Sequence, residues 1–131
     1  MNVISLIHRI LGETLLLVAL LGVILAVAGI VRKKKMDRPE KIFGLSYAGL
    51  LDLQALLGLI QFVYLLINGA TGLISSLFIL HPILMVLAVI VVHASRTWRE
   101  SPIPTRHRAQ LISYGLSLLL TFTGRMIMIV A

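Results

Sequence analysis

Long hydrophobic runs alternate with short polar segments along the whole chain. The four runs are Ile10–Val31, Gly44–Ile67, Gly72–Val92 and Ala109–Val130. Each is long enough to cross a bilayer, which takes roughly 20 helical residues. Helices are expected because the runs lack the alternation of membrane β-strands. We therefore predict an all-α fold with one domain over residues 1–131, an integral membrane four-helix bundle whose helices cover about 4–31, 43–67, 72–95 and 107–130.

The basic residues predict how the chain is oriented in a membrane. Ten of the twelve Lys and Arg residues lie in two segments, Arg32–Lys41 and Arg96–Arg108, after the first and third runs. By the positive-inside rule these segments belong to cytoplasmic loops, 32–42 and 96–106. The uncharged turn Asn68–Gly72 then lies outside. This predicts an antiparallel, up-down bundle with both termini outside (N-out and C-out), a multi-pass protein of a prokaryotic plasma (inner) membrane.

Composition agrees with a membrane protein and narrows the chemistry. Of the 131 residues 59% are hydrophobic and 13% are charged, whereas soluble domains have about 25% charged residues. The net charge of +7 is concentrated at the ends of the apolar runs, so we expect a lipid bilayer as partner and no nucleic acid. The absence of cysteine excludes disulfides, iron–sulfur clusters and thiolate metal sites. No nucleophile motif or phosphate loop is present, so independent catalytic activity is not expected.

Small and polar residues recur at helical intervals and predict how the helices pack. Such small-residue seams allow membrane helices to approach closely, and polar stripes must face inward because lipid offers them no partner. The first run carries the seam Gly12, Leu15, Ala19, Gly22, Ala26 and Gly29; the second carries the seam Gly44, Ala48, Ala55 and Gly58 beside the stripe Tyr47, Gln54 and Gln61; the fourth carries Gln110, Ser113, Ser117, Thr121 and Gly124.

Four ionisable residues lie inside the predicted spans, where such groups are rare and usually functional. Counting about 1.5 Å per residue, Glu13 and Arg125 lie near the outer surface, and we expect them to form an ion pair at the level of Gln61. By the same count, four residues on three helices form a layer near mid-membrane, either a network around neutral His81 or the surroundings of a cofactor. The members of this layer are Asp52, Gln54, His81 and Thr121.

His81 lies in an apolar run, where an imidazole is costly unless something binds it. Pro82 follows it and removes a backbone donor, so a local kink is expected to make room beside the ring. Met85 is one turn further along; it either packs on a macrocycle, acts as a weak axial ligand or belongs to the core. His93 and His107 lie at the inner ends of the third and fourth helices and are expected to be interface histidines.

Three local patterns together resemble one four-helix half of haem A synthase and, more loosely, four-helix membrane b-type cytochromes. They are His8-Arg9 at the start of the first helix, Gln54–Gly58 in the second, and His81 with Ala88 in the third. In that family, histidines on the first and third helices hold haem near the outer face. The resemblance implies that His8 and His81 ligate the iron and that Arg9 or Arg125 pairs with the haem propionates.

The chain also departs from that family. It has half the length of the synthase and four spans, and it lacks the glutamate-to-histidine motif of the catalytic half, so synthase activity is not expected. The predicted helix limits place His8 at the surface and His81 about 13–17 Å deeper. Ligation by both histidines therefore requires the first helix to begin earlier or to tilt. A second macrocycle between His93 and His107 has no counterpart in the family.

Three functions remain open on the sequence. The first is a haem b-binding protein for electron transfer, either a homo-oligomer or a cytochrome-like subunit of a larger membrane complex. The second is a cofactor-free accessory or assembly subunit whose polar stripes join helices. The third is a small proton-coupled transporter that uses Glu13. The expected pairing of Glu13 with Arg125 argues against this function. The presence of a bound chromophore discriminates the first from the second.

Overall fold

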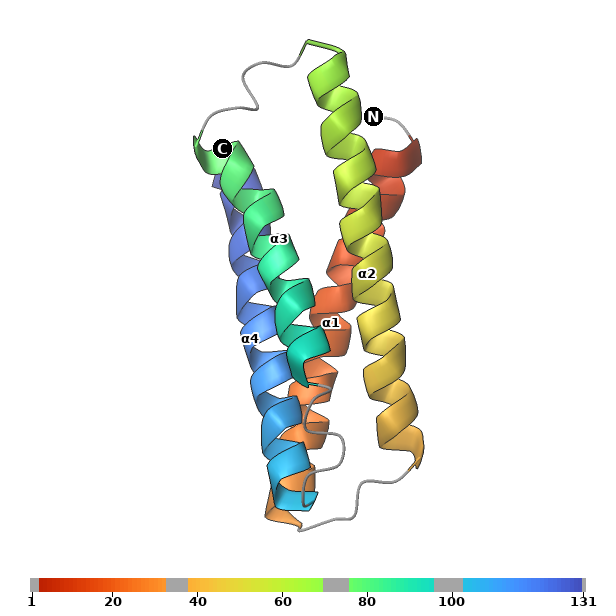
Figure 1. Cartoon of the computed structure of the whole chain (residues 1–131), viewed down its shortest axis with the longest axis vertical. Coiled ribbons are helices and arrows are strands. Elements are labelled where there is room, and N and C mark those ends of the chain that lie inside the picture. The colour runs from red at the N-terminus through yellow and green to blue at the C-terminus, as the bar shows by residue number, and fades with distance from the viewer. Residues whose placement is uncertain (1–2, 33–37, 70–75, 96–102, 131) are drawn as a thin grey trace.

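A computed structural model of the chain describes residues 3–32, 38–69, 76–95 and 103–130, which form four α-helices (Figure 1). The helices are α1 (Val3–Val31), α2 (Arg38–Ile67), α3 (Ser76–Ala94) and α4 (Ile103–Val130). The predicted all-α class and the number of helices are therefore confirmed for the described part of the chain. Residues 72–75, which we expected to begin the third helix, lie outside the described residues.

Two helices begin earlier than the sequence predicted. Residues 38–42 and 103–106 were expected to be loop, but they are the first turns of α2 and α4. Each of these turns contains a proline, Pro39 or Pro104. Proline is accepted in the first turn of a helix because the backbone N–H groups there have no partner within the helix. The polar and basic residues of both segments thus extend helices beyond the apolar runs.

Three of the helices are long and apolar enough to cross a membrane. They are Val3–Val31, Pro39–Ile67 and Arg106–Met128. The apolar part of α3 that the structure describes, Ile79–Ala94, is shorter. Three long apolar helices indicate a membrane protein, whereas a fourth span remains a prediction.

The helices form a closed ring in which each packs against two neighbours, with α4 making the most extensive contacts, to α1 and α3. In Figure 1 the beginnings of α1 and α3 lie at the same end of the bundle as the ends of α2 and α4. Residues far apart in the sequence are therefore brought to one level. We call this end, where α1 begins, the N-terminal end of the bundle.

The small-residue seam of α1 lies in the core, as its spacing predicted. Its buried members are Leu15, Ala19, Gly22, Ala26 and Gly29. Aromatic rings of α4 occupy the space that the glycines leave: a Cβ atom on Gly22 would lie 2.7 Å from the Tyr114 ring, and one on Gly29 would lie 2.6 Å from the His107 ring. The small residues thus decide how closely α1 and α4 approach.

The polar stripes face inward, which confirms that prediction. Tyr47 and Gln54 of α2 and Ser113 and Ser117 of α4 are buried. The Tyr47 hydroxyl and the Ser117 Oγ are 2.7 Å apart. Tyr47 and Ser117 thus satisfy each other across the bundle, as buried polar groups generally do.

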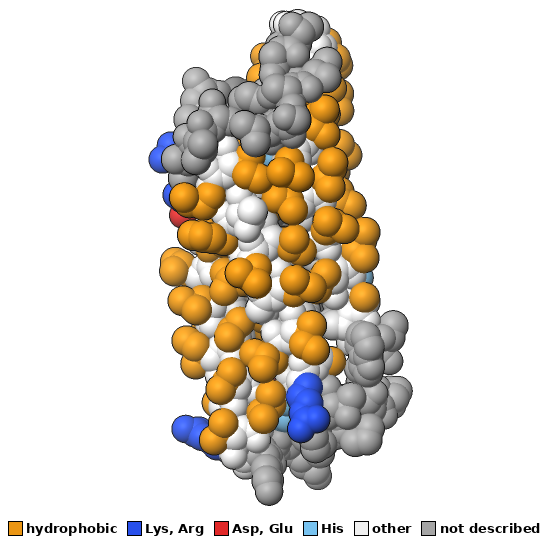
Figure 2. Space-filling view, turned by 90° about the vertical axis from the view of Figure 1, so that its left-hand side faces the viewer, with side chains coloured by type: hydrophobic (Ala, Val, Ile, Leu, Met, Phe, Trp, Pro, Cys, Tyr) orange, Lys and Arg blue, Asp and Glu red, His pale blue; other side chains and the backbone are white. Residues whose placement is uncertain are grey.

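Large aliphatic side chains cover the outside of the bundle. Figure 2 shows them spread over the middle of one face, with Lys and Arg side chains toward its ends. Leu17 is 70% exposed and Leu59 is 58% exposed. A soluble monomer rarely has such an extensive apolar surface, whereas the combination of small residues inside and large apolar residues outside suits a hydrocarbon environment.

We expect Gly22→Ala to destabilise the bundle, because the new methyl group would overlap the Tyr114 ring. Overpacking of this kind costs about 1–3 kcal/mol. Gly49→Ala and Gly115→Ala are matched controls, since nothing lies within 4 Å of a Cβ atom at either position. The measurement is thermal unfolding in detergent. Equal melting temperatures for all three variants would show that α1 and α4 are not in close contact at Gly22.

Candidate functional site

All four helices line a cavity of about 720 Å³ near the N-terminal end of the bundle. Most of its lining is apolar and includes Leu16, Phe62 and Met85. Its polar lining residues are Ser5, His8, Arg9, Glu13, Gln54, Gln61, His81, Thr121 and Arg125. An apolar cavity with a few convergent polar groups is the usual form of a binding site for a small molecule or cofactor.

Two histidines face each other at this cavity. The ring centroids of His8 on α1 and His81 on α3 are 6.4 Å apart, and the ring planes are inclined by 85°. The expected depth difference between them is therefore wrong. Both residues lie five positions after the beginning of their helices, at Val3 and Ser76, and both helices begin at the same end of the bundle. The sequence count failed because it measured depth from the beginnings of the apolar runs, Ile10 and Gly72, whereas α1 already begins at Val3 and includes His8.

A backbone carbonyl holds the His81 ring. His81 Nδ1 lies 2.9 Å from the carbonyl oxygen of Gly124. A carbonyl oxygen only accepts hydrogen bonds, so Nδ1 carries the proton and donates it, which leaves Nε2 with a free lone pair. This is the arrangement in which protein imidazoles bind metals, because the bond to Nδ1 fixes both the tautomer and the ring orientation.

His8 is held differently and has an unused nitrogen. Its backbone carbonyl accepts a hydrogen bond of 2.9 Å from Gln54 Nε2. Its Nδ1 atom is buried without a hydrogen-bond partner in the described part of the chain, as are Gln54 Oε1 and Gln61 Oε1. Buried polar atoms are rarely left unpaired in a folded protein. Three such atoms on residues that line one cavity indicate that the site takes a ligand or water.

Two glycines give the histidine rings their space. A Cβ atom on Gly58 would lie 2.9 Å from His8 Cε1, and one on Gly124 would lie 3.2 Å from His81 Nδ1 and 2.7 Å from Met85 Cε. Gly58 is part of the Gln54–Gly58 motif. The role of Gly124 at His81 was not predicted, because the sequence showed only that Gly124 belongs to the inward face of α4.

A charged corner completes the cavity. Glu13 on α1 and Arg125 on α4 form the ion pair that the sequence predicted, through Arg125 Nε and Nη2 and Glu13 Oε1. Arg9 lines the same cavity. Arg9 and the Glu13–Arg125 pair thus add two guanidinium groups and one carboxylate to a mostly apolar lining.

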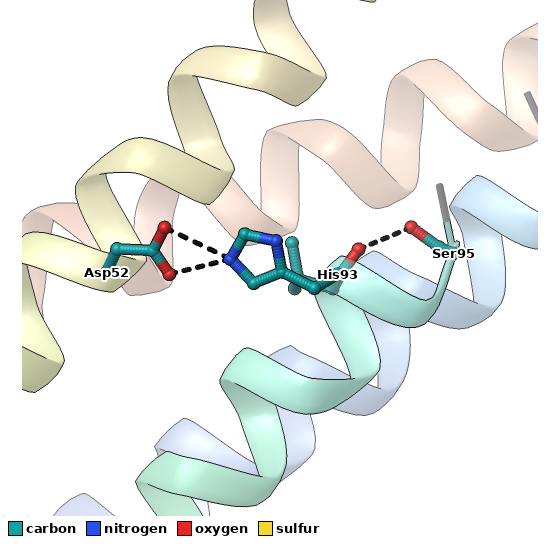
Figure 3. A network of polar contacts seen from close by, with 4 residues as sticks. Asp52, His93 and Ser95 are labelled. Carbon is teal, nitrogen blue, oxygen red and sulfur yellow. Dashed lines mark hydrogen bonds and ion pairs between the residues drawn. The ribbon is translucent and has the colours of Figure 1, made fainter. Parts of the chain in front are cut away.

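Asp52 does not belong to the His81 layer, contrary to prediction. It pairs with His93, whose Nε2 lies 2.8 Å and 3.0 Å from the two carboxylate oxygens (Figure 3). Asp52 and Gln54 are two positions apart on α2, which puts them about 200° apart around the helix. Gln54 therefore faces the cavity with His81 and Thr121, whereas Asp52 faces α3.

The Asp52–His93 pair was not predicted, and it joins α2 to α3, which share the smallest interface in the ring. Both side chains are half-exposed, Asp52 by 47% and His93 by 39%. Figure 3 shows the His93 ring pointing from the end of α3 toward Asp52, beside Ser95. Ser95 Oγ donates a hydrogen bond of 2.7 Å to the Val92 carbonyl and so closes the last turn of α3.

His93 and His107 are not among the residues that line the cavity. His107 is buried on α4 against Gly29, and His93 is engaged by Asp52. Among the described residues no three His, Asp or Glu side chains are placed to hold a bare metal ion. The pair His8 and His81 instead suits a metal whose remaining ligands come from a cofactor.

Comparisons with protein-family models, with curated proteins and with solved structures found no match. The resemblance to haem A synthase and to b-type cytochromes therefore remains a hypothesis, and the functional argument depends on the cavity, its two histidines and its charged corner.

We expect Asp52→Ala and His93→Ala each to loosen the contact between α2 and α3, and the double variant to cost little more than either single one. A half-exposed pair of this kind contributes about 0.2–1 kcal/mol. A double-mutant cycle on the free energy of unfolding in detergent measures the coupling. Strictly additive effects of the two substitutions would show that the residues do not interact.

Proposed function

We propose that this protein is a membrane-integral cytochrome-like protein that binds haem b between His8 and His81 and transfers electrons. The observation that carries the proposal is the position of the two imidazoles, which both line the cavity and have ring centroids 6.4 Å apart. Imidazole–metal bonds are about 2 Å long, so two rings on opposite sides of one metal have centroids about 6 Å apart. The spacing therefore supports ligation of one iron by both rings.

The surrounding residues suit this ligand. The Gly124 carbonyl fixes His81 in the tautomer that leaves Nε2 for the iron. The cavity volume of about 720 Å³ falls in the range of about 300–1,000 Å³ that is typical of ligand and cofactor sites. Met85 supplies apolar contact, and Arg9 and Arg125 offer guanidinium groups to carboxylates. Bound haem supplies a one-electron couple, and the apolar walls would exclude water from it and so tune its potential.

The proposed setting is a prokaryotic plasma membrane, crossed by all four helices in an up-down arrangement. The basic segments after α1 and α3 would face the cytoplasm, and both termini and the haem site would lie toward the outer face. The described helix directions in Figure 1 support such an arrangement, since α1 and α3 begin at the same end.

We further propose that the protein works as a homo-oligomer or as a subunit of a larger membrane complex. The half-exposed Asp52–His93 pair favours this, because it lies on α2 and α3 among exposed side chains such as Leu53 and Leu56. Polar pairs that face hydrocarbon are costly, so a second chain that covers this face would be favourable. The same surface would serve a cofactor-free accessory subunit, the second candidate function, and the test below discriminates the two.

We expect the detergent-purified protein, expressed with ample haem, to show a Soret band and a sharpened α band after dithionite reduction. His81→Ala and His8→Ala are expected to abolish or strongly reduce this low-spin spectrum, because each would remove one of the two histidines proposed to hold the iron. His93→Ala is the matched control and should keep it. A colourless protein would favour the accessory subunit, and a full haem spectrum in His81→Ala would exclude this site.

The cysteine-free chain allows a direct test of topology. We expect Asn68→Cys to react with a membrane-impermeant thiol reagent on intact cells, because the turn after α2 is predicted to lie outside. Arg32→Cys, at the end of α1, should react only after the membrane is permeabilised. Labelling in the opposite pattern would invert the proposed orientation.

A further inference from the structure

The charged corner of the cavity carries one acid, Glu13, and two basic groups, Arg9 and Arg125, and this composition bears on how the cavity binds its ligand. We infer that Glu13 competes with the carboxylates of the bound ligand for Arg125, so that it holds this arginine in the unloaded site and weakens the binding of haem. The inference rests on the proposed function, since haem is the ligand whose two carboxylates would meet this corner.

The geometry of the Glu13–Arg125 pair leaves room for a second carboxylate. Both Arg125 nitrogens in the pair, Nε and Nη2, contact the same oxygen, Glu13 Oε1. A bidentate pair would use both carboxylate oxygens. The Arg125 side chain is 40% exposed and that of Glu13 is 45% exposed. Because a guanidinium group has five N–H donors, a ligand carboxylate can reach Arg125 through the donors that Glu13 leaves, and it must then share the positive charge of Arg125 with Glu13.

The charges at the corner do not balance once a dicarboxylate is bound. Arg9 and Arg125 contribute two positive charges to the described lining, and Glu13 contributes one negative charge. A ligand with two carboxylates would bring the total to three negative charges against two positive ones. The surplus carboxylate is repelled by the others, and in a partly apolar site this repulsion is stronger than in water. Of these three carboxylates, Glu13 is the one that belongs to the protein.

In the ligand-free protein the Glu13–Arg125 pair has a positioning role. A guanidinium group in an apolar wall is unfavourable without a partner, and Glu13 is that partner. Glu13 therefore positions Arg125 at the cavity before the ligand arrives.

The test is a titration of the purified, ligand-free full chain with haem b, followed by the Soret absorbance. Glu13→Gln is expected to bind haem about two- to fivefold more tightly than the wild type, the equivalent of a half-exposed ion pair. Arg125→Gln is expected to bind more weakly, and the double variant should show a smaller gain from Glu13→Gln than the protein with Arg125 does. Asp52→Asn, which removes a carboxylate outside the cavity lining, is the matched control and should leave the affinity unchanged.

The dimethyl ester of haem provides a matched ligand without free carboxylates. We expect Glu13→Gln to bind this ester no more tightly than the wild type does. A gain with the ester equal to that with haem would overturn the inference, and so would unchanged or weaker haem binding by Glu13→Gln. If Glu13→Gln does not fold, Glu13→Asp replaces it, with a smaller gain of the same sign expected.

Failure of the proposed function gives a different result. In that case no variant, including the wild type, would show a Soret band that depends on His81. Haem binding that is lost in His81→Ala but indifferent to Glu13 would leave the proposed function standing and overturn only the competition.

Discussion

The close approach of α1 to its neighbours is the constraint on which the rest of the structure depends. Gly22 and Gly29 admit the rings of Tyr114 and His107 from α4, and Gly12 admits the Gln54 side chain from α2, with a Cβ atom there only 2.9 Å from Gln54 Nε2. In a bundle whose exterior is apolar, the hydrophobic effect drives little association between helices, so such fitting of large groups against small ones holds them together. The close approach of α1 to its neighbours also determines the position of His8.

The same fitting builds the site. Gly58 and Gly124 leave space at the rings of His8 and His81, and the Gly124 carbonyl accepts the bond from His81 Nδ1. One residue of α4 thus gives the imidazole both its room and its orientation. Because the rings come from α1 and α3, which begin at the same end of the bundle, a shift of either helix along its axis would separate them.

Polar side chains inside the bundle and on its surface have different kinds of partners. Inside, Tyr47 and Ser117 satisfy each other across helices, and Glu13 neutralises Arg125 at the cavity. On the exposed surface of the bundle, Asp52 and His93 join α2 and α3, the two neighbouring helices with the smallest shared interface. Glu13, Arg125, Asp52 and His93 therefore each have a partner on another helix, as the cost of unpaired charge in apolar surroundings requires.

The sequence by itself determined the four helices, the buried seam of α1 and the Glu13–Arg125 pair. The helices and the seam follow from the periodicity of residues within one segment. The ion pair follows from the rise of a helix, which puts Glu13 and Arg125 at the same depth near the ends of their helices. Only the tertiary structure decided that His8 and His81 meet, that Gly124 holds His81, and that Asp52 turns away from the cavity to His93. These contacts depend on where each helix begins and how it is rotated against its neighbours. Packing between segments fixes both, and no single segment encodes them.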